Sequence, residues 1–476
     1  MSSSKLLAAT VATLLAGCTA LAGCTVGPNY RGAPSAAPNS AKATSFNRAP
    51  QDAVTTAPAV ATWWANLSDP ELTRLIEGAL VNSPDIRAAQ ARLKQSRSSL
   101  AEKGKGRIPA VSGNAALLHA HLPSDTFGSI NFYNLGFDAT WEADLFGGTR
   151  RSIEAAKAEA VASEADLADT HVQLSAEVAQ AYVDLRDQQQ RLVLIKQSAD
   201  LEQKILDLTA QRRSQGVASE LDVERVRTQV ENTRQTLIPL EAQIAESLDQ
   251  LAVLTGREPG DLDGELGTST PLPTLPATVA VGDPAALLKQ RPDIRAAEFR
   301  LISKNAQIGQ HEADWFPKLT LIGDLGFSSS EPGHLVRSQS FMWIGAPFIT
   351  WNILDFGKNK ATVEGARAGY EEAEAKFEST VLGALRDANV ALSRYGHQRD
   401  NVVSLRRVED SATRAAELTE QRYHAGTTSA LDWLDAERTR FSAEQNRIAG
   451  DAELIKYYVS LQKSLGLGWQ SPPPKT

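Results

Sequence analysis

The sequence contains an internal duplication, which limits the fold of the chain more than any other feature. The segment Pro-Asp-Ile-Arg-Ala-Ala at residues 84–89 recurs at 292–297, 208 residues later. The segment WEADLFG at 141–147 recurs as WNILDFG at 351–357, 210 residues later. Spaced Pro, Trp and Gly matches in one order do not arise from a shared Ala-rich composition. Each half is therefore predicted to form one structural unit of the same plan.

The hydrophobic pattern changes in the same order within each half. Residues 69–104 and 283–315 show a helical spacing of apolar side chains. Residues 109–147 and 317–357 then switch to a period of two, which is typical of strands that cross a membrane with one face toward lipid. Each half thus supplies one β-hairpin and the chain four strands. The last strand holds Pro347, which suits a sheet edge or a bend.

A very long helix-forming run without proline follows each hairpin, at residues 149–215 and 358–425. At 1.5 Å per residue each helix could reach roughly 100 Å. A glycine ends each run and a shorter helix returns, at 219–254 and 429–465, with Ser219 and Ser429 as predicted N-caps. Helices of this length need partners, so coiled-coil packing is expected.

Charge and composition exclude several classes of protein. The 49 Lys and Arg against 57 Asp and Glu give a net charge of −8, which argues against a nucleic-acid-binding surface. Charged residues make up 22%, too many for a polytopic helical membrane protein. The two cysteines both lie in the first 24 residues, so the body has no disulfide and no thiolate metal site.

The N-terminus has the pattern of a processed and lipidated leader. An apolar stretch after Lys5 ends in Leu-Ala-Gly-Cys at residues 21–24, which resembles the bacterial lipoprotein box. That resemblance implies cleavage before Cys24, a diacylglycerol on its sulfur, and an added acyl chain. Thr25 in the next position resembles the outer-membrane sorting signal. Cys18 ends a similar segment, and a plain secretory signal with an accidental cysteine is the alternative.

These features predict the following organisation. A signal peptide at residues 1–23 is followed by a lipid-anchored extended leader at 24–62. The first repeat spans 63–258, with its hairpin at 109–147 and its long helices at 149–255, and a Pro-rich linker at 259–284 follows it. The second repeat spans 285–466, with its hairpin at 317–357 and its long helices at 358–465, and residues 467–476 form a C-terminal tail. Four strands cannot close a barrel, for which about eight are needed. An open sheet would leave unpaired edges in lipid, so several copies must complete the wall. The residues themselves leave two, three or four copies open.

Three segments together resemble the outer-membrane factor family. They are CTVGPNY at residues 24–30, the paired Pro-Asp-Ile-Arg-Ala-Ala segments, and Tyr-His-Ala-Gly at 423–426 running into Leu-Asp-Trp-Leu-Asp-Ala-Glu-Arg at 431–438. Members are the TolC-like exit ducts of tripartite efflux pumps, and the chain is most similar to the NodT/OprM lipoprotein branch. The resemblance implies a mainly helical homotrimer with a 12-stranded membrane barrel, a mixed equatorial domain and a 12-helix periplasmic barrel.

The same resemblance implies the function and the partners. The chain would be a passive export channel of the outer membrane, lipid-anchored and with a large periplasmic portion, and not an enzyme. Its partners would be a periplasmic adaptor, an inner-membrane transporter of RND type and outer-membrane lipid, with no nucleic acid. No cofactor or metal is implied beyond the lipid on Cys24.

The second glycine break is the expected gate. At helical spacing Leu431, Asp435 and Arg438 fall on one stripe. In the lipoprotein branch the matching positions form the periplasmic constriction, and Asp432 and Tyr423 match further gate positions. The alternative is a solvated face on which Asp435 and Arg438 form an ordinary surface ion pair. Some relatives carry an arginine where this chain has Thr428, and the first-repeat counterpart of Asp435 is Arg225, so the two halves are not equivalent here.

The two helix–helix turns are the expected contact with the adaptor, and ordinary tight turns without a partner are the alternative. The residues concerned are Arg212, Gly216, Val217 and Ser219 in the first repeat and Arg422, Gly426, Thr427 and Ser429 in the second.

Other chemistry is sparse. His311-Glu312 begins like a zinc-protease motif, but Trp315 occupies the second histidine position. His119 and His121 could share a strand face, yet a third metal ligand is not evident. Two further classes of protein stay open: a periplasmic adaptor lipoprotein with a long helical hairpin, and an enzyme or binding protein on a coiled-coil stalk. The exported substrate cannot be inferred from the sequence.

Overall fold

The computed structural model describes residues 25–50, 52–121 and 129–469. The chain divides into two compact units, and both sequence repeats contribute to each. The first unit combines Met1–Pro34, Ala91–Glu164 and Ala296–Ser379, and the second Ser35–Gln90, Ala165–Arg295 and Thr380–Thr476.

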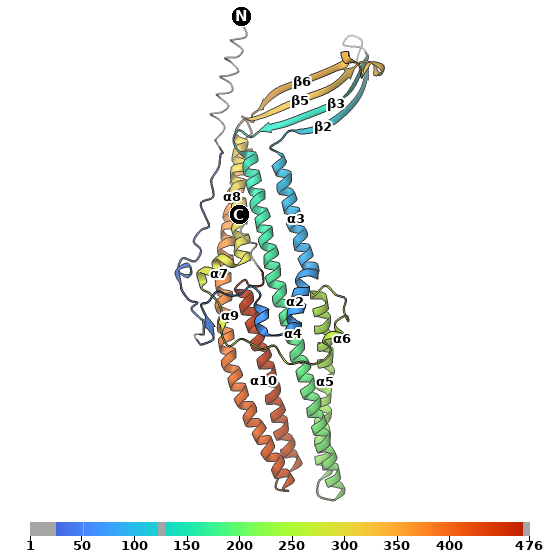
Figure 1. Cartoon of the computed structure of the whole chain (residues 1–476), viewed down its shortest axis with the longest axis vertical. Helices are drawn as coiled ribbons and strands as arrows, with labels where there is room; N and C mark the ends of the chain where they lie inside the picture. Colours follow the sequence, from blue (N-terminus) through green and yellow to red (C-terminus); the bar gives the residue numbers. More distant parts are fainter. Residues whose placement is uncertain (1–24, 51, 122–128, 470–476) are drawn as a thin grey trace. The chain divides into compact units, whose positions relative to one another are not determined.

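One four-stranded antiparallel sheet belongs to the first unit (Figure 1). Its order is β2-β3-β5-β6, which confirms the predicted two hairpins. Pro347 lies in the outer strand β6, as expected for a residue that donates no backbone hydrogen bond. The strands are β2 (Ala110–His121), β3 (Ser129–Ala143), β5 (Lys318–Ser329) and β6 (Phe341–Thr350).

The two faces of the sheet differ in polarity because side chains alternate along each strand. Leu135 and Phe137 of β3 are exposed apolar residues of one face. On the other face Asp138 pairs across the strands with Asp324, and the amide of Asn114 donates to the Asp138 carboxylate. The sheet thus has one apolar face and one face that carries a polar row.

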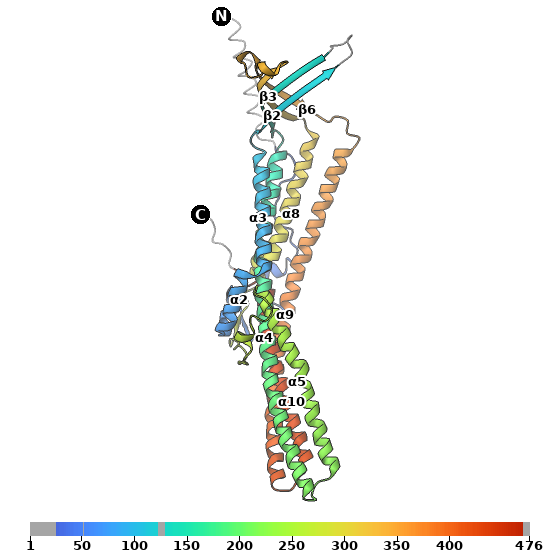
Figure 2. The same ribbon diagram turned by 90° about the vertical axis from the view of Figure 1, so that its right-hand side faces the viewer.

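Two pairs of long helices follow the hairpins, as predicted. The long helices α4 (Gly148–Ser214) and α9 (Lys358–His424) have 67 residues each. They return as α5 (Glu220–Leu254) and α10 (Ala430–Ser464), with 35 residues each. In the second unit, the α4–α5 and α9–α10 hairpins run side by side (Figures 1 and 2). The helices after the hairpin are therefore equal in length in the two repeats.

The helical segment before each hairpin is broken, whereas the sequence pattern predicts one continuous helical stretch. The first segment forms α2 (Pro70–Asn82) and α3 (Pro84–Lys105). The second forms α7 (Pro284–Gln290), α8 (Pro292–Glu312) and a short 3-10 helix η3 (Ala313–Trp315). Ser83 and Arg291 take extended ψ angles of 136° and 125°. The proline that follows each of them disfavours helical geometry at the preceding residue.

The leader and the Pro-rich linker also contain structure that the sequence pattern did not predict. Their strands β1 (Val54–Thr55) and β4 (Val279–Ala280) form a small parallel sheet. Short helices lie in the leader, directly after it, in the linker and in the loop of the second hairpin: η1 (Ser40–Lys42), η2 (Trp63–Leu67), α6 (Asp263–Leu266), η4 (Pro332–His334) and η5 (Ser338–Ser340). The loop of the first hairpin, residues 122–128, lies outside the described residues.

The core of the second unit holds large aromatic residues and one buried cation. Trp63 packs edge-on against Tyr458, whose hydroxyl donates to the Trp63 carbonyl at 3.2 Å. Arg186 is 2% exposed and donates to the carbonyls of Leu266 and Thr268 at 3.2 and 2.9 Å. The buried guanidinium thus fixes the linker to α4. Within the described ranges, none of the helices combines the length and apolar character needed to cross a membrane.

Candidate gate at the helix tips

Both helix–helix turns have the same backbone geometry. Gly216 and Gly426 each have a φ of 76°, in the left-handed region that glycine adopts without strain. The next amide reaches back across the helix end in each turn, from Val217 to the Arg212 carbonyl and from Thr427 to the Arg422 carbonyl, both at 2.9 Å. This is the Schellman pattern, which closes a helix by satisfying its last carbonyls.

A capping box begins each returning helix and confirms the predicted N-caps. The Ser219 hydroxyl accepts from the Asp222 amide at 3.2 Å, and the Ser429 hydroxyl accepts from the Asp432 amide at 3.1 Å. Each aspartate in turn accepts from its serine amide at 3.0 Å. Hydrogen bonds from the Ser429 hydroxyl and amide lower the pKa of Asp432.

Asp432 is therefore first a capping residue rather than a free gate carboxylate. The Thr428 hydroxyl donates a further hydrogen bond to the same carboxylate at 2.8 Å. The first repeat contains the same aspartate at the same place, Asp222, with its pKa lowered by the same kind of contacts. Such reciprocal caps satisfy amides that the helix leaves unpaired.

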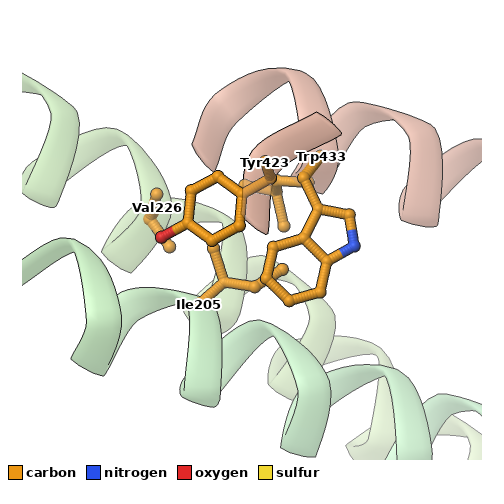
Figure 3. Packing of buried hydrophobic residues seen from close by; sticks show 5 residues of the cluster. Ile205, Val226, Tyr423 and Trp433 are labelled. Atoms are coloured by element: carbon orange, nitrogen blue, oxygen red, sulfur yellow. The ribbon is translucent and has the colours of Figure 1, made fainter. Parts of the chain in front are cut away.

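Tyr423 lies in the packed interface between the two hairpins, not on an exposed face. It is 2% exposed and stacks on Trp433, with ring centroids 5.0 Å apart and planes at 30°. Figure 3 shows the two rings against each other, with Ile205 and Val226 beside them. The ring of Tyr423 is thus enclosed by its own chain, and the expectation that it belongs to the gate stays a prediction.

Arg212, expected to contact an adaptor, also takes part in this packing. Its guanidinium carbon lies 4.2 Å from the centre of the Tyr423 ring. A cation over an aromatic face is attracted by the ring quadrupole. Arg212 therefore joins the first hairpin to the second.

The remaining gate candidates lie on the outside of α10. The Asp435 and Arg438 side chains are 69% and 60% exposed and form an ion pair at 2.9 Å. Leu431 is partly buried against the Tyr423–Trp433 cluster. The surface ion pair expected as the alternative is thus present, and the exposure of both side chains leaves them able to face a pore.

The structure contains a buried carboxylate near Arg438 that the sequence pattern did not predict. Glu202 of α4 is 2% exposed and lines a cavity of about 260 Å³ that Arg438 and Phe441 also line. Burial raises the pKa of Glu202, and the charge of Arg438 acts against that shift. The only sign of this burial in the sequence is that the glutamate lies between the apolar positions Leu201 and Ile205. Many glutamates on exposed helix faces have such neighbours, so the pattern does not distinguish Glu202 from them.

Residues 25–30 are held closely by the helix that follows the first hairpin. Arg151 of α4 is 3% exposed and donates to the carbonyls of Val26 and Gly27 at 3.1 Å each, and to the side chain of Asn29 at 2.7 Å. The amide of Val26 donates to the carbonyl of Phe146 at 3.0 Å. Residues 25–30, here called the strap, are thus fixed at the end of β3. Cys24 itself lies outside the described residues.

Close backbone contact with α8 also holds the strap in place. Gly27 has a φ of 88°, and a β-carbon added there would lie 2.2 Å from the α-carbon of Gly309. The side chain of Asn305 donates to the Pro28 carbonyl at 2.9 Å. The strap therefore lies directly on α8, and its glycine is required by space as well as by conformation.

The histidines flagged in the sequence find other partners. The ring of His119 hydrogen-bonds to the side chain of Asn131, and His311 lies 3.7 Å from Asp314. Across residues 25–50, 52–121 and 129–469, no group of three His, Cys, Asp or Glu could hold a metal ion.

The four-stranded sheet and the paired long helices have the architecture of an outer-membrane channel, and comparison with known proteins identifies the family. The family model for outer membrane efflux proteins matches residues 75–257 and 284–467. Outer membrane protein OprJ of Pseudomonas aeruginosa is 31% identical over 86% of this chain and 86% of its own length. Antibiotic efflux pump outer membrane protein ArpC of Pseudomonas putida is 30% identical over 94% of this chain and 93% of its own.

A solved structure gives the same result. The outer-membrane channel OprN matches with a TM-score of 0.86 at 34% identity, covering 94% of this chain and 100% of that one. The chain belongs to the outer membrane efflux protein family, as the resemblance predicted. It is an efflux channel of the outer membrane, and the adaptor alternative finds no support in these relatives.

Proposed function

We propose that the chain is the exit duct of a tripartite pump, a passive homotrimeric channel that performs no chemical reaction. A periplasmic adaptor and an inner-membrane transporter of RND type would deliver the substrate. The observation that carries this proposal is the sheet: four strands, one apolar face and two unpaired outer strands, β2 and β6. Three copies would give 12 strands, enough to leave an aqueous channel, whereas one copy cannot close.

Conductance of the purified protein tests the proposal. Oligomers extracted in detergent should have the mass of a trimer by native mass spectrometry and should conduct ions after insertion into a planar bilayer. A monomer that conducts no current would refute the proposal.

The proposed gate is the stripe of Leu431, Asp435 and Arg438, of which Asp435 and Arg438 are exposed and Leu431 is partly buried. Copies of Asp435 around a common axis would place carboxylates near one another, which favours cations in the pore. Its ion pair with Arg438 at 2.9 Å would hold the side chain in place. Asp432 and Tyr423 would support the stripe from behind, through the helix cap and the packed cluster.

The first prediction concerns this gate. Asp435→Ala should raise the single-channel current and lower the preference for cations, because a ring of negative charge is removed from the constriction. Arg225→Ala is the matched control, since Arg225 holds the same position in the first repeat. Current and reversal potential in asymmetric KCl measure both effects. Equal changes in the two variants would reject the gate assignment.

The helix tips are the proposed contact with the adaptor. Val217 is 72% exposed, and Thr427 is exposed as well, at the end of each turn. Gly216, Ser219, Gly426 and Ser429 build the turns that present them. Val217→Asp should weaken co-purification of the adaptor without changing the single-channel current, and unchanged co-purification would move the contact elsewhere.

Cys24 is the proposed lipid attachment, because the strap holds the adjacent residue Thr25 close to Gly147 at the end of β3. Acyl chains there would enter the membrane beside the sheet. The mass of the N-terminal peptide tests this directly: an unmodified cysteine, or cleavage at Cys18, would contradict it. ArpC is named as an antibiotic efflux protein, and antibiotics are the proposed class of substrate.

A further inference from the structure

Three helices of the second unit enclose the cavity that contains the buried carboxylate of Glu202. Its walls come from α4, α5 and α10, and its volume is about 260 Å³. One water molecule occupies about 30 Å³ in the liquid, so the cavity has room for a molecule of several non-hydrogen atoms. Asn232, Thr236 and Ser442 also line the cavity and are exposed, which gives a ligand a way in from solvent.

One oxygen of the Glu202 carboxylate lacks a partner. The Oε1 atom accepts a hydrogen bond from the Ser198 hydroxyl at 3.4 Å. The Oε2 atom is buried and has no hydrogen-bond partner in the part of the chain that the structure describes. A buried carboxylate without a partner costs free energy, and natural structures leave few such groups unsatisfied. The cavity therefore suits an occupant that donates hydrogen bonds to Oε2.

The cation that the chain itself places at this cavity has another partner. Arg438 is the only positively charged side chain among the described residues that line the cavity. Its guanidinium pairs with Asp435 at 2.9 Å, and the side chain is 60% exposed. A positively charged ligand at Glu202 would thus complete an ion pair that Arg438 does not supply by direct contact.

The lining indicates which kind of cation fits. The side chains of Ser198, Gln229 and Thr233 lie near the carboxylate, and their oxygen atoms can accept hydrogen bonds. Leu194 and Phe441 are buried members of one hydrophobic cluster and give the cavity an apolar wall. A primary ammonium group donates three hydrogen bonds, and a short alkyl chain attached to it would lie against the apolar wall.

A bare metal ion suits this cavity less well. Glu202 is the only carboxylate among the described residues of its lining. Divalent ions in proteins are usually held by several charged or imidazole ligands. A single ion would also leave most of the 260 Å³ without contacts.

We propose that the cavity between α4, α5 and α10 binds a primary ammonium compound with a short alkyl chain, and that Glu202 is its counter-ion. The ammonium group donates to Oε2 and to the neighbouring side-chain oxygens, and the alkyl chain packs on Leu194 and Phe441. The site lies within a single chain. Its occupancy therefore depends neither on the proposed trimer nor on the proposed gate.

Binding of n-butylamine to the purified full chain in detergent tests the proposal. Saturation-transfer NMR at about pH 8, where a primary amine keeps its proton, reports which small molecules contact the protein. Butylamine should give a saturable signal, and n-butanol, which has the same chain without the charge, should bind much more weakly. Glu202→Gln should weaken butylamine binding by about tenfold or more, because a neutral hydrogen bond replaces a charge-assisted one.

Glu231→Gln is the matched control, because it neutralises a carboxylate of α5 that is 65% exposed and does not line the cavity. Its affinity for butylamine should equal that of the unaltered protein. Equal binding by the Glu202→Gln and Glu231→Gln variants would overturn the site. The comparison of amine and alcohol needs no variant, and equal binding of the two would overturn the role of the charge. Displacement of butylamine by KCl, but not by tetramethylammonium chloride at the same ionic strength, would replace the ammonium ligand with an inorganic cation and so refute the proposal.

Discussion

At the scale of single residues, neighbouring side chains near Gly426 have quite different surroundings. Tyr423 is enclosed by the two hairpins, Asp432 is bound to the start of its own helix, and Asp435 is exposed. The sequence resemblance predicts all three as gate residues. In the structure Tyr423 takes part in packing, Asp432 caps a helix, and Asp435 lies on the surface, which is why the proposed gate is centred on Asp435.

The packed cluster leads to a stability prediction. Trp433→Ala should lower the local stability of the tips by about 3–5 kcal/mol, because it removes a large buried ring and leaves a cavity. Hydrogen exchange of amides in α5 and α10 near the turns would measure the loss. Val217→Ala, at an exposed position, should change it by no more than about 0.5 kcal/mol. Equal protection in both variants would mean that the cluster does not hold the hairpins together.

The strap also depends on one residue. Arg151 makes three contacts with residues 25–30 through a single buried guanidinium. In protein carrying Cys24→Ser, produced with a cleavable secretory signal, the strap should still resist protease because the protein itself holds it. Adding Arg151→Gln should expose it, while Arg150→Gln, which alters an arginine paired with Asp144, should not. A strap that is cut equally in all three proteins would show that the seat does not form in solution.

At the scale of elements, local signals define where helices begin and end. Serine caps start α5 and α10, glycines in left-handed geometry end α4 and α9, and prolines split the helices before each hairpin. Such signals act within a few residues, so they can be identified in a sequence. The prolines that break the helices are also visible in the sequence. The helical spacing of apolar residues continues on both sides of them, however, and it predicts one unbroken helix.

Two glycines in the second repeat should respond to alanine with opposite signs. Gly426→Ala should destabilise the turn by about 1 kcal/mol, because its φ of 76° strains an L-residue although no atom obstructs the new β-carbon. Gly365→Ala in the open interior of α9 should stabilise the protein by about 0.5–1 kcal/mol. Urea unfolding of the solubilised protein measures both, and a shared sign would contradict the backbone argument.

At the scale of the whole molecule, duplication supplies two hairpins and two helix pairs from one plan. The copies then diverge: Phe146 is stacked within the chain whereas Phe356 is exposed, and Arg225 stands where the second repeat has Asp435. The strap is seated at Gly147 in the first repeat, whereas the space around Gly357 in the second is open. Only the first repeat therefore holds the leader at this position.

The sequence alone determined the duplication, the strand and helix periods, the caps, and the family to which the chain belongs. These features are local or repeat along the chain, so residue spacing expresses them directly. Only the tertiary structure decided that Tyr423 is enclosed, that Glu202 is buried, and that Arg151 holds the strap. Each of these depends on which helix faces meet across a long stretch of chain, and that choice is made by the packing of many side chains at once.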